Sequence, residues 1–408
     1  MQQEKEEQVH ISRMLKTTAT GFVVVMLAAA CGSSSGSTSS SGGGTARPAP
    51  PAGTMATSVG AGEGELNLIT WPDYADDGTN GTPDTTGPFT KATGCQVNVK
   101  VGNTSDEMVT LMKTGQYDGV SASGDATLRL IYGGDVAPVN TALVPNYTTV
   151  AEFLKNKQWN SVNGQMYGIP HGWGANVLAY NLAAVKPAPT SWSVVFDANS
   201  PYKGKITAYD SPIYIADAAL YLMKTKPDLK ITNPYALDQT QFQAAVDLLK
   251  QQRTMISSYW ASYTDEVKSF DAGAAVVGTA WQVNVNTMKA GTVGSLVPSE
   301  GATGWSDTWM IATKAAHPNC MYKWLDYIIS PEANAGVAAY FGEAPAQTKA
   351  CDISADMKAH CETYHALDPA YADSISYWTT PTKNCLDGRG DICVDYSAWV
   401  QAWTEIKG

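Results

Sequence analysis

The sequence predicts an α/β fold with a mainly parallel sheet, divided into two lobes. Short segments that alternate polar and apolar residues recur along the chain, and helical segments separate them, which is typical of a parallel sheet covered by helices. About 345 residues follow a low-complexity N-terminal stretch, and this length favours two lobes over one. Hydrophobic residues make up 44% of the chain, enough to fill two cores.

The first 31 residues have the features of a bacterial export signal. Arg13 and Lys16 precede an apolar run over residues 21–30 that ends in small residues and is too short to span a bilayer. Cys31 follows the alanines directly, at the position of the acylated cysteine of a lipoprotein. We therefore predict a lipoprotein signal peptide over residues 1–30 and a mature chain that begins with lipidated Cys31. The alternative is a secretory signal with an incidental cysteine.

A low-complexity segment follows this signal. Residues 32–44 are almost all Ser and Gly, and residues 46–53 are rich in Pro and Ala. Such a composition buries too little apolar surface to fold. We expect residues 31–63 to form a flexible tether. The folded body would then lie outside the cytoplasm, attached to the cell membrane through the lipid alone.

Charge and aromatic content limit the classes of partner. The net charge of −11 disfavours nucleic acid and favours cationic ligands. The chain contains 12 Trp and 20 Tyr but only 7 Phe, and amphipathic aromatic residues are typical of wet binding clefts.

Strands and helices are expected to alternate along the folded body. The strand pattern occurs over residues 65–70, 96–101, 117–120, 175–180, 274–281 and 305–312. The helical pattern occurs over residues 105–113, 241–259 and 321–329, and residues 208–224 are expected to form a turn followed by a helix. We expect the strand at 175–180 to cross into the second lobe and the strand at 305–312 to return. The region from Cys351 onward is rich in loops, and no internal repeat is visible.

The familiar signatures of enzymes and metal sites are missing. Residues 119–124 (GVSASG) lack the G-x-S-x-G spacing of a nucleophile elbow, and the glycines of residues 60–64 lie in the tether. His360 and His365 are five residues apart, so they share no helical face, and the chain has no C-x-x-C motif. We therefore predict no enzymatic activity, no cofactor and no metal site.

An aromatic residue and a polar one occur together beside several predicted strand ends. The four pairs are Trp71-Pro-Asp73-Tyr74, Tyr209-Asp210, Trp281-Gln-Val-Asn284 and Trp305-Ser-Asp307. Ligands bind at the carboxyl ends of strands in α/β sheets. A tryptophan face beside a carboxylate suits an ammonium group on a methylene chain. For any single pair, the alternative is a core tryptophan beside a helix-capping aspartate.

These motifs carry a family resemblance. From Glu65 to about Pro345 the chain resembles the periplasmic spermidine/putrescine-binding proteins of ABC importers. The matching segments occur in the expected order: ITWPDY at 69–74, GIPHGWG at 168–174, YDSP at 209–212, GTAW at 278–281, PSEG at 298–301 and WSD at 305–307. The region from Cys351 onward matches less well.

The resemblance implies a type II periplasmic binding fold. Each lobe would have a mainly parallel sheet flanked by helices, and two crossing strands would form the hinge. The first lobe would comprise residues 64–175 and 307–350, and the second residues 176–306 and 351–408. The protein would be a monomer that closes on a polyamine and delivers it to ABC permease subunits.

The resemblance also implies a set of ligand contacts. Trp71 and Tyr74 would be aromatic walls, and Ser123 would hydrogen-bond to ligand or water. The ammonium acceptors would be Asp73, Asp210 and Asp307, with Trp281 and Trp305 sandwiching the methylene chain.

Several positions depart from the family pattern. Ile213 and Tyr214 stand where the family has an acidic residue. Asn284, Glu343 and Asp125 also differ from the family and are further candidate ligand contacts. These changes leave open whether spermidine, putrescine or another cation is bound.

Two other classes of function remain open at this point. One is the same fold binding a different small solute, such as an amino acid, a quaternary amine or a sugar. An anionic solute would need Arg or Lys at the cleft, and the motif segments contain none. The other is a tethered exported hydrolase, which the missing nucleophile and base argue against.

Six cysteines besides Cys31 are expected to form three disulfides, out of 15 possible connectivities. We predict that Cys351–Cys361 and Cys385–Cys393 close short loops. Cys95–Cys320 would then tie the first and last parts of the first lobe together. The main alternative is a nested pairing, Cys351–Cys393 with Cys361–Cys385.

Overall fold

The computed structural model describes residues 47–408. The predicted signal peptide, the predicted lipidation site Cys31 and residues 31–46 of the predicted tether lie outside the described residues. Residues 47–63, which the prediction also placed in the flexible tether, instead lie against the first lobe: Gly60 N donates to Asn319 Oδ1, and Ala56 O accepts from Asn140 Nδ2. Within residues 47–408, no helix combines the length and the apolar character that crossing a membrane requires.

The first lobe is built on a seven-stranded sheet with the order β13-β6-β12-β3-β1-β2, in which β14 also pairs with β12. Strand β1 pairs in parallel with β2 and β3, whereas β12 runs antiparallel to β3 and β6. The strands are β1 (Glu65–Thr70), β2 (Gln96–Val101), β3 (Gly119–Ala122), β6 (Ile169–Ala175), β12 (Ala302–Ile311), β13 (Ala344–Pro345) and β14 (Ile375–Tyr377).

Helices flank this sheet, and a short hairpin of β4 (Ser161–Val162) and β5 (Gln165–Met166) lies beside it. Phe89 packs edge-on against Trp324, so that α1 and α9 share one aromatic cluster. The helices are α1 (Thr86–Thr93), α2 (Ser105–Met112), α3 (Gly124–Gly133), α9 (Pro318–Ile328), α10 (Pro331–Phe341), α11 (Ala355–Thr363) and α12 (Pro369–Asp373).

The second lobe is built on a five-stranded sheet with the order β11-β7-β10-β8-β9. Strand β8 is parallel to β9 and β10, and β7 is antiparallel to β10 and β11. The strands are β7 (Val177–Asn181), β8 (Ile206–Tyr209), β9 (Ile256–Trp260), β10 (Val277–Ala280) and β11 (Val293–Leu296). The helices are α4 (Ser193–Phe196), α5 (Ile215–Thr225), α6 (Gln239–Arg253), α7 (Tyr263–Asp271), α8 (Gln282–Thr287) and α13 (Tyr396–Lys407).

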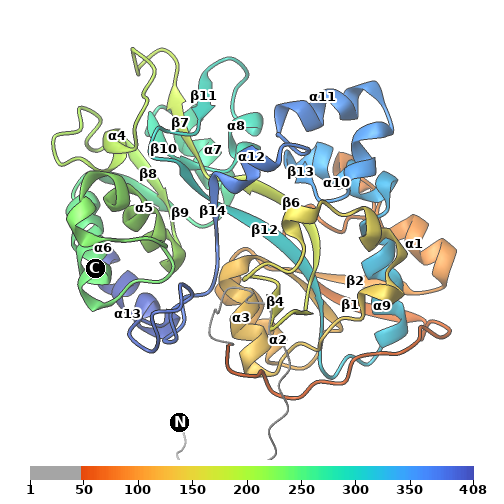
Figure 1. The fold of residues 1–408 in the computed structure, drawn as a ribbon. Helices are drawn as coiled ribbons and strands as arrows, with labels where there is room; N and C mark the ends of the chain where they lie inside the picture. Colours follow the sequence, from red (N-terminus) through yellow and green to blue (C-terminus); the bar gives the residue numbers. More distant parts are fainter. Residues whose placement is uncertain (1–46) are drawn as a thin grey trace, which may run out of the picture. The chain divides into compact units, whose positions relative to one another are not determined.

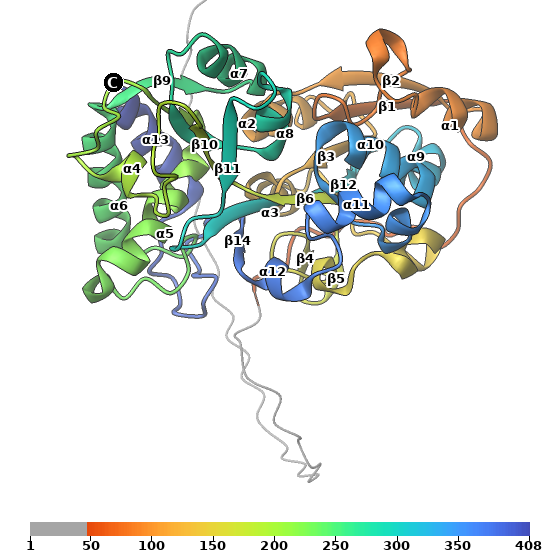
Figure 2. The same cartoon turned by 90° about the horizontal axis from the view of Figure 1, so that it is seen from above.

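The chain passes between the two sheets at three places. Only Asn176 separates β6 from β7, and β12 brings the chain back from the second lobe as a strand of ten buried residues. The third passage follows β14 and leads to α13, which packs against α6 (Figures 1 and 2). Two sheets with flanking helices, joined by crossing strands, confirm the predicted two-lobed α/β fold. The sheets are mixed and not mainly parallel as predicted, because each contains as many antiparallel as parallel strand pairs.

The predicted lobe boundaries group residues 351–408 together in the second lobe. In the structure, β14 pairs with β12 of the seven-stranded sheet, and the disulfide Cys351–Cys361 joins the turn before α11 to that helix. Helix α13 packs against the second lobe instead. This C-terminal region therefore contributes to both lobes.

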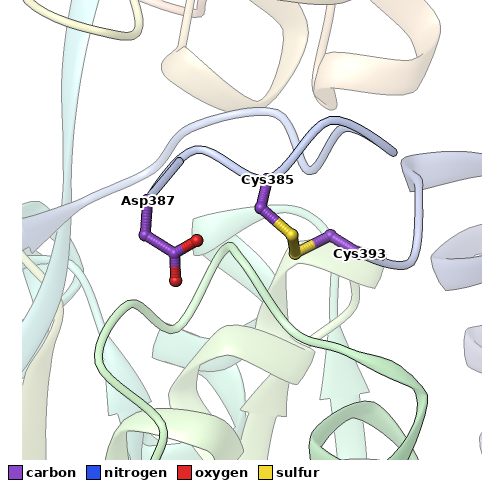
Figure 3. Close-up of side chains that lie close together, drawn as sticks. All are labelled: Cys385, Asp387 and Cys393. Atoms are coloured by element: carbon purple, nitrogen blue, oxygen red, sulfur yellow. A yellow bond between two sulfur atoms is a disulfide. The ribbon is translucent and has the colours of Figure 1, made fainter. Parts of the chain in front are cut away.

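Three disulfides are present within residues 47–408, and they are the predicted pairs. Cys95–Cys320 spans 225 positions in the sequence and joins the start of β2 to α9, while Cys351–Cys361 and Cys385–Cys393 close short loops. Figure 3 shows Asp387 beside the Cys385–Cys393 disulfide. Because both sulfurs are bonded to each other, and Asp387 accepts a hydrogen bond from Arg389, this cluster offers no thiolate to a metal ion.

Candidate ligand-binding site

A small cavity lies between the lobes, and its lining comes from strand ends. Trp71, Ser123, Trp281 and Trp378 directly follow β1, β3, β10 and β14. The strand periodicity of two places Trp305 and Asp307 on one face of β12, and Phe341 from the end of α10 completes the lining. The cavity has a volume of about 10 Å³.

Asp307 is the carboxylate of this cavity. Its side chain is buried; Oδ1 accepts a hydrogen bond from Ser123 Oγ, and Oδ2 accepts one from Tyr74 Oη at 2.7 Å. No Lys or Arg within residues 47–408 forms an ion pair with it. Burial raises the pKa of Asp307 to about 7, against the effect of these two hydroxyl donors. A buried carboxylate without a cation gains from a cationic ligand.

A second buried carboxyl, Glu343, lies behind Asp307. Tyr74 Oη is 2.7 Å from Asp307 Oδ2 and 2.7 Å from Glu343 Oε2, yet a tyrosine hydroxyl has only one proton to donate. One of the two carboxyls must therefore be protonated when both contacts are hydrogen bonds. Burial raises the pKa of Glu343 well above its usual range, and Asp307 has a second hydroxyl donor in Ser123, so we assign the proton to Glu343 and the Tyr74 donor to Asp307.

Glycine makes room for Glu343. A Cβ added at Gly172 would lie 2.2 Å from the Glu343 carboxyl carbon. His171, the neighbour of this glycine, places Nε2 3.6 Å from Glu343 Oε1, and burial lowers the pKa of His171 to about 3. With the proton assigned to Glu343, a neutral imidazole faces a neutral acid, and Asp307 is the carboxyl of this pair that can present a charge to the cavity.

Aromatic rings form the walls of the cavity. Trp71 meets Trp281 edge-on across the lobes with ring centroids 6.2 Å apart, and Trp305 meets Phe341 edge-on at 6.0 Å. Trp378 stacks on Tyr209 at 5.7 Å and an interplanar angle of 8°.

Trp378 reaches this position because the chain passes very close to α3. A Cβ at Gly124 would lie 1.7 Å from the Trp378 carbonyl oxygen, and Thr380 N donates to Gly124 O at 2.9 Å. Only glycine allows this approach at the start of α3.

A second cavity of about 10 Å³ adjoins the first, because Trp281 and Trp378 line both. Its other lining residues come mainly from the ends of β8, β9 and β10 and from the start of α5. They are Asn176, Tyr209, Tyr214, Asp217, Trp260, Thr279 and Ala280.

The structure brings five of the predicted site residues together in the first cavity: Trp71, Ser123, Trp281, Trp305 and Asp307. Tyr74 and Glu343 lie behind Asp307 and line neither cavity. Asp73 accepts a hydrogen bond from Tyr263 Oη of the second lobe at 3.4 Å, outside both cavities.

The other predicted acidic and amide residues already have partners. Asp210 Oδ1 accepts hydrogen bonds from Lys407 Nζ at 2.7 Å and from Trp403 Nε1 at 2.9 Å, and it lines neither cavity. Asp125 Oδ1 accepts from Ser105 Oγ, and Asn284 Nδ2 donates to Glu266. Neither Asp125 nor Asn284 lines a cavity.

Sequence reasoning missed Trp378, Phe341 and Asp217. Trp378 directly follows a strand, as Trp71 and Trp281 do, so the same pattern signals it once β14 is recognised. Asp217 lies in the first turn of α5, after the tyrosine–aspartate motif at β8. No pattern in the sequence marks Phe341.

A two-lobed α/β fold with an aromatic, acidic cavity between the lobes defines a periplasmic binding protein of type II. The chain belongs to the family of bacterial extracellular solute-binding proteins, which matches residues 86–363.

Relatives of known name are similar over most of the chain. The putrescine/agmatine-binding protein of Pseudomonas aeruginosa is 25% identical over 306 residues, which cover 71% of this chain and 80% of that protein. The putrescine-binding periplasmic protein PotF of Escherichia coli is 24% identical over 336 residues, or 77% of this chain and 87% of PotF.

A solved structure shows the same fold. It is the spermidine/putrescine ABC transporter substrate-binding protein PotD of Streptococcus pneumoniae, with a TM-score of 0.65 and 18% identity. The match covers 84% of this chain and 99% of PotD.

Proposed function

We propose that this chain is the extracytoplasmic substrate-binding component of an ABC importer and that it captures a polyamine between its lobes. The observation that carries the proposal is Asp307, a buried carboxylate that has no cationic partner among residues 47–408 and is set among tryptophan rings. The names of the relatives from P. aeruginosa and E. coli support putrescine-like ligands.

The chemistry of the cavity suits an alkylammonium group. A hydrogen bond between an ammonium and a buried carboxylate contributes about 1.5–3 kcal/mol. Tryptophan faces attract the cation and pack against the methylene groups. The ligand would also supply the positive charge that Asp307 lacks within the described residues.

Binding requires the lobes to move apart. A cavity of about 10 Å³ is roughly the space of one water molecule, so it is too small for a diamine. The Trp71–Trp281 and Asp73–Tyr263 contacts join the lobes across the site, and their opening would admit a ligand. Closing again would exclude water and strengthen the charge–charge contacts.

An amino acid is less well matched than a polyamine. Nε1 of Trp71, Trp305 and Trp378 has no hydrogen-bond partner within residues 47–408, so these groups offer donors to a ligand oxygen. However, no Lys or Arg of the described part of the chain lines either cavity, and a ligand carboxylate would lie close to Asp307. Repulsion between the two carboxylates favours a ligand that carries only positive charge.

Anchoring through Cys31 is part of this proposal and rests on the sequence alone. The apolar run, the cysteine after it and the Ser/Gly-rich tether together support a lipoprotein held at the cell membrane. A Cys31→Ala variant is expected to leave the membrane fraction or to stay unprocessed. Normal processing with membrane retention would contradict the lipid anchor.

Calorimetric titration of the purified protein with a panel of putrescine, spermidine, amino acids and sugars tests the ligand class. We expect binding of a polyamine with a Kd in the micromolar range or below, and no turnover of the ligand. Heat from a sugar or an amino acid, with none from any polyamine, would reject the proposed function.

A further inference from the structure

The second cavity contains a buried carboxylate that the sequence motifs do not mark. Asp217 lies in the first turn of α5 with 6% of its surface exposed, and it lines the cavity. No Lys or Arg within residues 47–408 pairs with it. Burial raises the pKa of Asp217 to about 7, which reports the cost of charging it there.

A chain of hydrogen bonds orients Asp217 and leaves acceptors at the cavity. Asn176 Nδ2 donates to Thr303 Oγ1 at 2.7 Å, and Thr303 Oγ1 donates to Asp217 Oδ1 at 2.9 Å. In this chain Asn176 donates through its amide nitrogen and Thr303 through its hydroxyl. Asn176 Oδ1 therefore has no partner within residues 47–408. Asn176 is 5% exposed and lines the same cavity, so a buried carbonyl oxygen lies beside a buried carboxylate.

Aromatic residues surround these two acceptors. The polar groups of Trp260 and Tyr214 are hydrogen-bonded to other residues, so these two side chains present mainly ring surface to the cavity. Trp260 Nε1 donates to Thr279 O at 3.0 Å, and Tyr214 Oη accepts from Gln252 Nε2 at 2.9 Å. Trp260 meets Trp281 edge-on at 5.0 Å. Two acceptors within an aromatic wall suit a cationic nitrogen attached to carbon.

The position of this cavity links it to Asp307. Trp281 and Trp378 line both cavities, so a linear ligand that passes these two rings can reach Asp307 with one end and Asp217 with the other. Asp210, the acceptor expected from the motif, is held by Lys407 and Trp403 instead.

We propose that Asp217 and Asn176 form a second cation-binding subsite, and that the ligand is a linear dication with one nitrogen at Asp307 and the other at Asp217. This inference rests on the proposed polyamine function and adds the number of charges on the ligand. A monoamine would neutralise one buried carboxylate and leave the other without a counter-charge. A diamine would neutralise both carboxylates, so the protein would bind a diamine more tightly than a monoamine.

The test compares Asp217→Asn with a matched control, Asp210→Asn, in calorimetric titrations with putrescine and with butylamine. Asparagine keeps the shape of aspartate and can still accept the Thr303 hydrogen bond. We expect Asp217→Asn to weaken putrescine binding at least about tenfold, the loss of one charged hydrogen bond, and to change butylamine binding little. Asp210→Asn should bind putrescine within about twofold of the unmodified protein, a change too small to report a lost charged contact.

The unmodified protein supplies a second measurement that does not depend on the folding of a variant. It should bind putrescine at least about tenfold more tightly than butylamine, because only the diamine forms the second charged contact. Equal affinity for the two amines would reject the second subsite. Putrescine binding that survives Asp217→Asn, or that is lost in Asp210→Asn, would also reject it while leaving the proposed function intact. Failure of the unmodified protein to bind any polyamine would instead reject the proposed function.

Discussion

Asp307 and Asp217 are both buried acids beside Trp281 and Trp378, but the protein holds them differently. Asp307 lies on β12 in the first lobe and accepts two hydroxyl hydrogen bonds, from Ser123 and Tyr74. Asp217 lies at the start of a second-lobe helix and accepts one, from Thr303 of β12. Asp307, which has more hydroxyl donors, is suited to anchor any ammonium group. Asp217, which has fewer, is suited to discriminate between ligands.

Asp210 shows what happens to a third acid close by. It follows β8 by one residue, yet its carboxylate contacts Lys407 of α13, and it remains partly exposed. Within residues 47–408, Asp307 and Asp217 differ from the other buried acids because they line a cavity and also have no Lys or Arg partner, whereas a place in a motif does not separate them. Five predictions test this contrast, in decreasing order of the expected change.

Asp307→Asn should have the largest effect. Losing the anchoring charge is expected to weaken binding of both putrescine and butylamine by about 100-fold, in line with roughly 3 kcal/mol for a buried charged contact. Titration calorimetry measures both affinities. The exposed Asp228→Asn variant is the matched control and should bind like the unmodified protein. If Asp307→Asn keeps the affinity for butylamine, Asp307 is not the acid that anchors every ammonium group, and its proposed difference from Asp217 is wrong.

Acidification should weaken binding by about tenfold or more between pH 7.5 and 5.5, since both acids must be charged to hold the ligand. Burial raises the pKa of each to about 7, so each becomes protonated within this range. Titrations at several pH values measure the effect, and Asp217→Asn should reduce the slope. An affinity for putrescine that does not change with pH would contradict the assignment of both acids.

The raised pKa values of Asp307 and Asp217 affect the stability of the ligand-free protein in the opposite direction. Each acid has a folded pKa of about 7, against an ordinary value of 3.8, so the folded state binds more protons between these values. Stability is therefore expected to fall as the pH rises through this window. Thermal melts of the ligand-free protein at pH 5 and pH 8 measure this, with the lower Tm expected at pH 8.

Trp281→Ala should weaken putrescine binding by about tenfold, because this ring borders both cavities and packs on the methylene chain. The loss for butylamine should be smaller, since butylamine occupies one cavity only. Tyr340→Ala, at an exposed aromatic residue, is the control. An equal loss for both amines would mean that the ring serves a single subsite.

Tyr74→Phe should have the smallest effect, a loss of about three- to fivefold, or roughly 1 kcal/mol for one hydrogen bond to Asp307. The phenyl ring keeps the contacts with His171 and Phe341, so the fold should persist. Fluorescence titration of the tryptophans measures the affinity. A loss as large as that of Asp307→Asn would show that Tyr74 contacts the ligand directly.

Much of the fold was predictable because local patterns determine it. Alternating residues mark β1 and β2, and the cysteine spacings favour the short loops that Cys351–Cys361 and Cys385–Cys393 close. The pairing of β14 with β12 was not predictable, because only three residues pair, and the contact depends on Gly124 admitting Trp378.

The candidate site was predictable only in part, for a physical reason. Trp71, Trp281 and Trp305 lie at or beside strands in recognisable motifs, and the structure gathers them around Asp307. Whether an acid faces a cavity depends on its tertiary partners. Lys407 lies 197 positions from Asp210, and Thr303 lies 86 positions from Asp217, so local sequence does not reveal either contact.

A crystal structure of the protein grown with putrescine would show directly which acids hold the ligand. We expect one diamine running past Trp281 and Trp378, with one nitrogen at Asp307, the other at Asp217 beside Asn176, and the Lys407–Asp210 pair intact. A diamine nitrogen at Asp210 in place of Lys407, or a diamine bound outside the two cavities, would contradict it.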